Sequence, residues 1–299
     1  MGHSKKKLIQ LVDGMPAFPP SVYHILKLTA DINCAPKELV RVIDLDPVLT
    51  MKLLQLVNSP YFGLSRQIGS IRQAVVFVGI NTIKNLALTI APMEMLSRDN
   101  LNTPFLEGLL SHAIAVGVVA RHLARRGGVS ELESTDFFVA GLLHDFGKIA
   151  LHRFFPRKHA KALALAAKKG IPLHEAERQI LNLDHSQIGA MLADKWQLPP
   201  ACMASMGQHH RWKNRENFLA LDCVYAANII AKTIGVGDSG NPVTETTLPH
   251  EIEQRLGGTL PELIGTLGDL SGEMHKVQLL LHSWNANGTT HPQPPTEPL

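Results

Sequence analysis

Apolar residues recur along this chain at intervals of three and four, the spacing of helices that bury one face. No stretch shows a convincing two-residue alternation of the kind that is typical of a strand. Prolines at first turns and glycine or asparagine near last turns mark where the helices begin and end. The pattern therefore predicts an all-α protein. The expected helices span residues 20–30, 36–43, 47–57, two segments between 70 and 95 that are interrupted near Gly79, then 105–126, 136–151, 156–169, 173–181, 185–196, 200–210 and 217–234, with a last helical pair reaching about 284.

Polar segments divide this helical pattern into parts. Residues 97–104 are the best candidate for a joint, and residues 237–250 are expected to form a surface loop. The tail contains four prolines and is expected to be disordered. We therefore expect an N-terminal helical part over 8–100, a second helical part carrying the candidate chemistry over 101–235, C-terminal helices over 236–284 and a tail over 285–299.

Composition changes this picture little. Hydrophobic residues make up 45% of the chain and charged residues 18%, which is ordinary for a globular protein. The formal charge of +3 is too small to indicate a nucleic-acid or anionic-membrane partner. Three scattered cysteines suit a reducing compartment, no apolar run reaches 18 residues, and the N-terminus lacks the apolar core of a signal peptide. The expectation is a cytoplasmic protein without a membrane or nucleic-acid partner.

The sharpest local signal is the pentapeptide HDFGK, which begins at His144. It lies in a segment so apolar that its helix should be buried on nearly all sides. A buried Asp145 has a large desolvation cost unless it is paired or coordinated, and a metal cation with a neighbouring imidazole would satisfy it. A protonated or hydrogen-bonded structural aspartate beside a core histidine is the alternative.

Other histidines fall on buried faces or at helix ends. His112 lies on the apolar stripe of its helix and points inward, where a hydrogen-bonded core histidine is the simpler alternative. His185 follows Asp184, an expected N-cap whose capping-box partner is the glutamine three residues on. It then lies in the first turn, either facing a ligand or half-exposed. His209 and His210 end a helix, and because adjacent side chains diverge, at least one is expected to be a ligand.

The order H…HD…H…HH resembles the HD superfamily of metal-dependent phosphohydrolases, especially its two-metal branch related to the HD-GYP phosphodiesterases. The resemblance implies a ligand set in two halves that share one aspartate: His112, His144 and Asp145 in the first, and Asp145, His185 and His209 in the second, with His210 nearby. Lys148 matches the lysine after the doublet, which in such enzymes lies near substrate phosphate.

The N-terminal half narrows the resemblance to one family. Its specific segments are MPAFPPSV, DLDPVLTMKLLQLVNSPYFG and SIRQAVVFVGINTIKNL, followed by FFVAGLLHDFGKIAL and LDHSQIGAMLADKWQLP. They resemble the HDOD family, and the resemblance covers roughly residues 8–235. It implies an all-α helical bundle of HD-domain type with an N-terminal helical subdomain. Nothing comparable is found over residues 236–284.

Two departures from the HD pattern bear on activity. Asn228 stands where the final aspartate is expected, on a stripe that faces the cage, so it is included among the candidate ligands. A neutral amide oxygen binds a hard cation less strongly than a carboxylate does. In addition, RWKNRENF follows His210 in place of a GYP segment. His152 matches no ligand position and is expected at the surface.

Two classes of function follow from the resemblance. The favoured one is a regulatory HDOD protein that acts on a protein signalling partner and holds one or two divalent transition-metal ions, with iron or manganese expected ahead of zinc. Tyr61 and Phe62 would be candidates for the partner surface, unless they pack internally. The other is a metal-dependent phosphohydrolase acting on a phosphorylated small molecule, with Asp145 and Lys148 as catalytic residues.

Overall fold

The computed structural model describes residues 19–268 apart from 32, 60–63, 65, 98–102 and 212–217, together with residues 272 and 275. Every regular element in this described part is a helix, so the prediction of an all-α fold is confirmed. The proline-rich start, Tyr61 and Phe62, most of RWKNRENF, most of the last expected helix and the tail lie outside the described residues. The expected division at residues 100, 235 and 284 stays a prediction.

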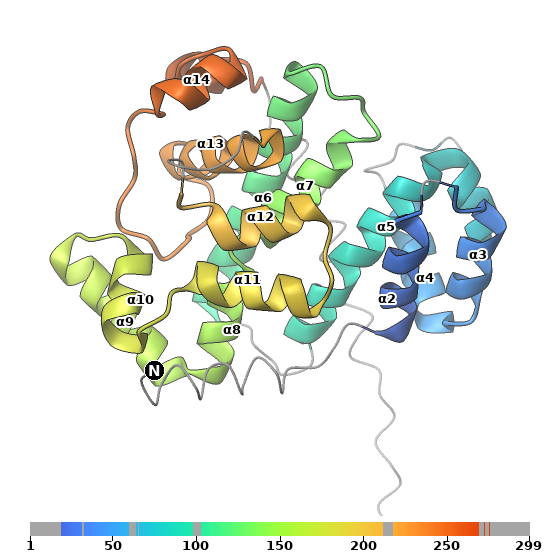
Figure 1. The fold of residues 1–299 in the computed structure, drawn as a ribbon, viewed down its shortest axis with the longest axis horizontal. Coiled ribbons are helices and arrows are strands. Elements are labelled where there is room, and N and C mark those ends of the chain that lie inside the picture. Colours follow the sequence, from blue (N-terminus) through green and yellow to red (C-terminus); the bar gives the residue numbers. More distant parts are fainter. Residues whose placement is uncertain are drawn as a thin grey trace, which may run out of the picture.

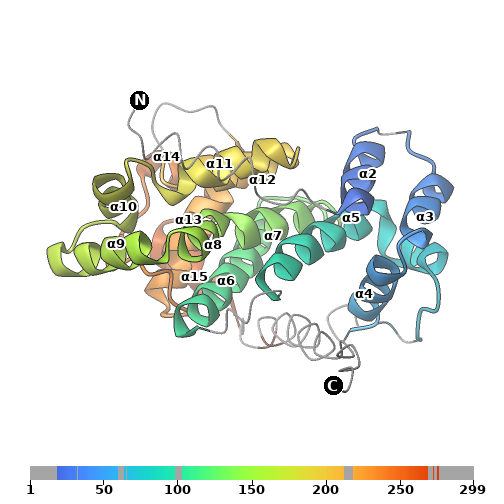
Figure 2. The same ribbon diagram turned by 90° about the horizontal axis from the view of Figure 1, so that it is seen from below.

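The N-terminal helices form a group at one side of the molecule, at the right of Figures 1 and 2. They are α2 (Pro20–Thr29), α3 (Pro36–Asp44), α4 (Pro47–Val57) and the first part of α5 (Ile71–Ser97). Each of the first three begins at a proline, whose missing N–H suits the first turn. Their inner faces bury large aliphatic side chains such as Ile25, Leu39 and Leu53.

Helix α5 changes direction at Gly79, whose φ of 81° and ψ of 161° are non-helical, so the expected interruption is confirmed. Beyond it, Asn85 and Lys84 donate hydrogen bonds of 2.8 and 3.1 Å to Asp136 Oδ1. The sequence predicts that a helix begins at residue 136. This is wrong, because α7 (Ser134–Leu143) begins two residues earlier and Asp136 lies inside its first turn. Its carboxylate instead joins α7 to α5.

The remaining helices build the larger part of the molecule around α6 (Figure 2). They are α6 (Pro104–Arg126), α7, α8 (Phe146–Phe154), α9 (Pro156–Lys169), α10 (Leu173–Leu181), α11 (His185–Lys195), α12 (Pro200–Gln208), α13 (Leu219–Thr233), α14 (His250–Leu256) and α15 (Leu260–Gly265). Helices α7 and α13 pack along α6, and α11 lies between α8 and α12. This arrangement brings α6, α8, α11, α12 and α13 to one interior region.

The sequence predicts one continuous helix over residues 136–151. This is wrong, because the structure has two helices here with a break beside Asp145. The helix is interrupted between α7 and α8, where Asp145 has a φ of −97° and a ψ of 11°. Gly147 then lets α8 approach α11, because a β-carbon at this position would overlap the carbonyl oxygen of His185. The interruption and the close approach together bring Asp145 beside the start of α11.

Two helical segments, Ile71–Ile90 and Pro104–Arg126, are long and apolar enough to cross a membrane by length and composition alone. In each, 61% of the apolar window is buried inside the structure. The core helices of a globular protein have the same properties, so these segments are weak evidence for a membrane span. The expectation of no membrane partner stays a prediction.

Candidate metal centre

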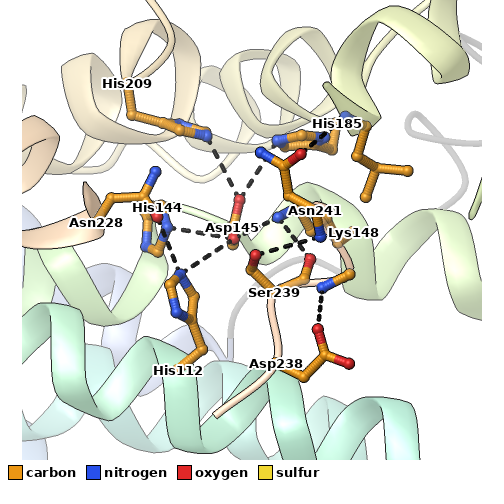
Figure 3. Close-up of polar contacts among 12 residues, drawn as sticks. His112, His144, Asp145, Lys148, His185, His209, Asn228, Asp238, Ser239 and Asn241 are labelled. Carbon is orange, nitrogen blue, oxygen red and sulfur yellow. Dashed lines mark hydrogen bonds and ion pairs between the residues drawn. The ribbon is translucent and has the colours of Figure 1, made fainter. Parts of the chain in front are cut away.

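Asp145 lies at the centre of a buried cage of polar side chains (Figure 3). His112 comes from the middle of α6, His144 from the α7–α8 junction, and Asn228 from α13. His185 is the first residue of α11, after the capping box that Asp184 and Gln187 form as predicted. The structure thus brings together every side chain that the sequence singled out: His112, His144, Asp145, Lys148, His185, His209, His210 and Asn228.

Each carboxylate oxygen of Asp145 faces its own set of side chains. The Nε2 atoms of His185 and His209 both lie 3.4 Å from Oδ1. His144 Nε2 lies 3.2 Å from Oδ2, and His112 Nε2 lies 3.9 Å from it. Asp145 Oδ2 therefore faces the half of the predicted ligand set formed by His112 and His144, and Oδ1 faces the half formed by His185 and His209.

The histidine tautomers are suited to metal binding. The Nδ1 atoms of His144 and His209 lie 2.6 and 2.7 Å from the backbone carbonyls of Gly141 and Ser205. Because a carbonyl oxygen only accepts, Nδ1 carries the hydrogen in both rings, and the Nε2 lone pair points into the cage. These two Nε2 atoms and Asp145 Oδ1 are buried without a hydrogen-bond partner in the part of the chain that the structure describes. A cation would satisfy all three.

The separations between candidate ligand atoms also fit a bound ion. Ligand atoms that bind one ion at about 2.1 Å lie about 3.0–3.4 Å apart in octahedral or tetrahedral coordination. The His144–Asp145 and His185–Asp145 separations fall in this range. His112 Nε2 instead donates a 3.0 Å hydrogen bond to Asn228 Oδ1, which a bound ion would replace. The candidate ligand atoms form two groups, His112–His144–Asp145 and His185–His209–His210, each within 4.8 Å. The imidazole and carboxylate donors suit a divalent transition metal.

Burial keeps four of the cage histidines neutral. It lowers the pKa of His112 to about 3, and it lowers the pKa of His185, His209 and His210 as well. Burial alone would raise the pKa of the Asp145 carboxyl, but interactions with His144 and Lys148 outweigh it and hold this pKa well below its usual range. The cage therefore presents these four neutral imidazoles around an ionised carboxylate, the protonation states that a metal ion requires.

Lys148 supplies the cation that balances Asp145 in this structure. Its Nζ donates a 2.6 Å hydrogen bond to Asp145 Oδ2 and a 2.9 Å hydrogen bond to the carbonyl of Ser239. The Lys148 side chain is buried. The ammonium is thus fully engaged inside the cage, whereas the family resemblance implied that it would lie near a substrate phosphate.

The segment 237–241, expected to be surface loop, is partly buried and covers the cage. The Asp238 N–H donates a 2.9 Å hydrogen bond to the Gly108 carbonyl on α6, and Ser239 is buried. Gly237 has a φ of +71°, and a β-carbon there would overlap the amide nitrogen of His112. The surface-loop prediction is therefore wrong for residues 239–241, which are buried or half-buried, whereas Gly237 and Asp238 are exposed as expected. Backbone carbonyls and glycines carry no hydrophobic periodicity that would reveal this burial.

Two residues of α10 contact the cage histidines and were not among the predicted site residues. Glu177 accepts a 2.6 Å hydrogen bond from His185 Nδ1, and His174 stacks on His210 with ring centroids 4.2 Å apart. The apolar stripe of α10 provides a signal that could have revealed Glu177, because it places a carboxylate among buried positions. His152 was expected at the surface; it is half-buried and stacks on Phe105 at 5.1 Å.

Comparison with known proteins identifies the family. The family model of the HDOD domain matches residues 15–212, and the chain therefore belongs to the HDOD domain family. Among curated relatives it is 28% identical over 199 residues to an uncharacterised protein of Treponema pallidum (strain Nichols), covering 67% of this chain and 38% of that one. It is 25% identical over 218 residues to Ribonuclease Y of Mycoplasma mycoides, covering 72% and 44%. The chain thus spans less than half the length of these relatives.

Solved structures share the fold. An HDOD domain protein with unknown function from Geobacter sulfurreducens has a TM-score of 0.73 at 23% identity, covering 92% of this chain and 98% of that one. A candidate phosphohydrolase from Shewanella amazonensis SB2B has a TM-score of 0.69 at 22% identity, covering 92% and 97%. A candidate signal transduction protein from Marinobacter aquaeolei VT8 has a TM-score of 0.74 at 19% identity, covering 93% and 64%. At these identities the likeness shows the fold alone.

The metal-free protein is expected to lose stability as the pH falls from about 6.5 towards 3. The pKa values of His112 and of His159, which is buried on α9, are lowered from 6.5 to about 3, so only the unfolded chain takes up their protons in this window. Each such histidine contributes a slope of up to about 1.4 kcal/mol per pH unit. Above pH 4.5 Glu177 has the opposite effect on the free energy of unfolding. Burial raises its pKa to about 8, so the stability that it contributes is lost as the pH rises towards 8, and this slope offsets that of one histidine.

Urea unfolding at a series of pH values, with chelator present, measures this dependence. The two histidines outweigh the single glutamate, so the free energy of unfolding should fall continuously below pH 6.5. A free energy that stays constant between pH 6.5 and 5 would show that these imidazoles are protonated in the folded state.

Asn228→Asp is expected to tighten manganese binding by roughly one to two orders of magnitude, because an added negative charge beside a dication is worth several kcal/mol even when screened. The Asn228 amide already lies 3.0 Å from His112 Nε2, so the new carboxylate would face the cage. Chelator competition measures the dissociation constant. Asn182→Asp, at an exposed turn after α10, is the matched control. Equal affinities of the two variants would show that residue 228 does not act on the ion.

Proposed function

We propose that this chain is a regulatory HDOD protein whose cage holds one or two divalent transition-metal ions, and that it acts through a protein partner. The observation that carries the proposal is the enclosure of the cage. Its candidate ligands are buried apart from the half-buried His210, and the 237–241 segment accepts a hydrogen bond from Lys148 through the Ser239 carbonyl. A closed cage suits a structural or sensing ion better than turnover of a substrate. The similarity to a candidate signal transduction protein is in keeping with this role.

Hydrolysis of a phosphoester is the second candidate, favoured by the near-complete histidine set and by the candidate phosphohydrolase of similar fold. A divalent ion in the cage would supply Lewis-acid chemistry by activating water and neutralising phosphate oxygens. Lys148 would have to leave the Ser239 carbonyl to orient a phosphate. Asn228 leaves the cage one negative charge short of the expected pattern. These two features make the regulatory role the better supported one.

Metal analysis of protein purified without chelator, followed by hydrolysis assays, tests the proposal. The assays use a generic phosphomonoester, a generic phosphodiester and a short RNA, the last because of the similarity to Ribonuclease Y. We expect about one or two equivalents of iron or manganese and no turnover. Hydrolysis that is lost in His144→Ala would overturn the purely regulatory role. Protein without metal that also fails to take up added iron or manganese would overturn the metal centre itself.

The choice of iron or manganese over zinc, the protein partner and the cytoplasmic location remain predictions. Elemental analysis tests the first directly. Crosslinking followed by identification of the captured protein tests the second, with a variant lacking metal as the control. A partner that binds both forms equally would show that the ion has no part in recognition.

A further inference from the structure

Glu177 is a fully buried carboxylate just outside the cage, on α10. Its Oε2 accepts two hydrogen bonds from one residue, at 2.6 Å from the ring Nδ1 of His185 and at 2.8 Å from the His185 backbone N–H. Its Oε1 is buried without a hydrogen-bond partner among the residues that the structure describes. The carboxylate therefore faces the centre of the cage only through the His185 imidazole.

These contacts determine how His185 presents its ring. An ionised carboxylate only accepts, so beside an ionised Glu177 the Nδ1 atom of His185 carries the hydrogen. The Nε2 lone pair is then directed to the cage, where it accepts a 2.7 Å hydrogen bond from His210 Nε2 and lies 3.4 Å from Asp145 Oδ1. For His144 and His209, backbone carbonyls accept the hydrogen bond from Nδ1 instead. Among these three rings, His185 is the one whose tautomer is set by a carboxylate.

The charge of the cage gives this carboxylate a second role. Asp145 is the one carboxylate among the cage side chains, and Lys148 already balances it. Asn228 contributes no charge where the family pattern has an aspartate. A divalent cation bound in the cage would therefore receive little negative charge from the side chains that bind it directly. A carboxylate hydrogen-bonded to a ligating histidine raises the basicity of that ligand and is a common way to supply such charge.

A purely structural role for Glu177 would be to satisfy the N-terminus of α11. That terminus is already capped, because Asp184 accepts from the Gln187 backbone N–H at 2.8 Å and the Gln187 side chain accepts from the Asp184 N–H at 3.1 Å. Arg178, the next residue on α10, donates a 2.6 Å hydrogen bond to Asp184 Oδ2 and holds the cap in place. The capping box does not include the His185 N–H, from which Glu177 accepts, so the structural role accounts for one of its two hydrogen bonds and leaves the bond to the His185 ring Nδ1 unexplained.

We propose that Glu177 is a positioning residue of the metal centre: it orients His185 with Nε2 toward Asp145 and, when ionised beside a bound dication, it supplies through that imidazole negative charge that Asn228 does not. The inference rests on the proposed metal centre. If Glu177 has this role, an ion binds more tightly to the group formed by His185, His209 and His210 than to the group formed by His112, His144 and Asp145.

Two substitutions separate charge from orientation. Glu177→Gln keeps an oxygen that can accept from both donors of His185 but removes the charge, whereas Glu177→Ala removes both. Glu175→Gln is the control, since it makes the same change at an exposed position of α10. The dissociation constant for manganese is measured on the metal-free full chain by chelator competition. Long-range proton–nitrogen NMR spectra of the His185 ring report its tautomer without any metal.

We expect Glu177→Ala to weaken manganese binding by about 10- to 100-fold and to lose the Nδ1–H form of His185. Glu177→Gln should retain that form and still bind more weakly than Glu175→Gln. Adding Asn228→Asp to Glu177→Gln should restore affinity. If circular dichroism shows that the alanine variant is unfolded, the glutamine variant carries the test. Equal affinity of Glu177→Gln, Glu177→Ala and Glu175→Gln would overturn the inference, whereas a wild-type chain that binds no manganese would contradict the metal centre instead.

Discussion

Asp145→Ala is expected to abolish metal binding and to lower the free energy of unfolding of the metal-free protein by about 3–5 kcal/mol. The carboxylate is the one group that faces both halves of the cage. Its removal also leaves the buried Lys148 ammonium with the Ser239 carbonyl as its remaining hydrogen-bond partner among the described residues. An uncompensated buried charge is the larger source of the destabilisation, so the effect should be present without metal.

Elemental analysis and urea unfolding of the metal-free protein check the two parts of this prediction separately. Asp145→Ala combined with Lys148→Met is the control, because it removes both charges and keeps the volume of the lysine stem. The double variant should regain much of the lost stability while remaining free of metal. If Asp145→Ala still binds a full equivalent of manganese, Asp145 is not a ligand. A double variant no more stable than the single one would show that cavity formation, and not the unpaired ammonium, dominates.

Gly147→Ala is expected to lower the free energy of unfolding by at least about 1–3 kcal/mol, the range that is typical of an overpacked core. A β-carbon at residue 147 would overlap the backbone carbonyl of His185, which cannot rotate away as a side chain could. Helices α8 and α11 must then move apart. Because Asp145 precedes α8 and His185 begins α11, the same movement should weaken manganese binding.

Gly265→Ala is the matched control for this substitution. It lies at the end of α15, where an added β-carbon meets no atom within 4 Å, so a neutral or slightly stabilising effect is expected. Thermal unfolding and chelator competition are measured on both variants. A Gly147→Ala protein with the stability and manganese affinity of Gly265→Ala would show that α8 and α11 do not require this close approach.

The helix positions were predictable because their signals are local. Proline at the first turn and the capping box at Asp184 act within a few residues, so α2, α3, α4 and α11 begin where the pattern indicates. Burial of His112 was also readable, since the apolar stripe of α6 defines which face points inward. Burial of the His144–Asp145 doublet indicated pairing or coordination, whereas the full set of candidate ligands followed from the resemblance to the HD superfamily.

What the sequence by itself determined is an all-α chain with a buried His-Asp doublet and several inward histidines. Only the tertiary structure decided how they meet. The break between α7 and α8 depends on packing against neighbouring helices. The position of residues 237–241 depends on contacts with α6, and Glu177 on α10 reaches His185 at the start of α11. These features depend on contacts between segments distant along the chain or on the packing of whole helices, which leaves no periodic pattern in either segment. The sequence therefore predicted the ligands of the candidate metal centre, and the fold determined their geometry, their tautomers and the charge around them.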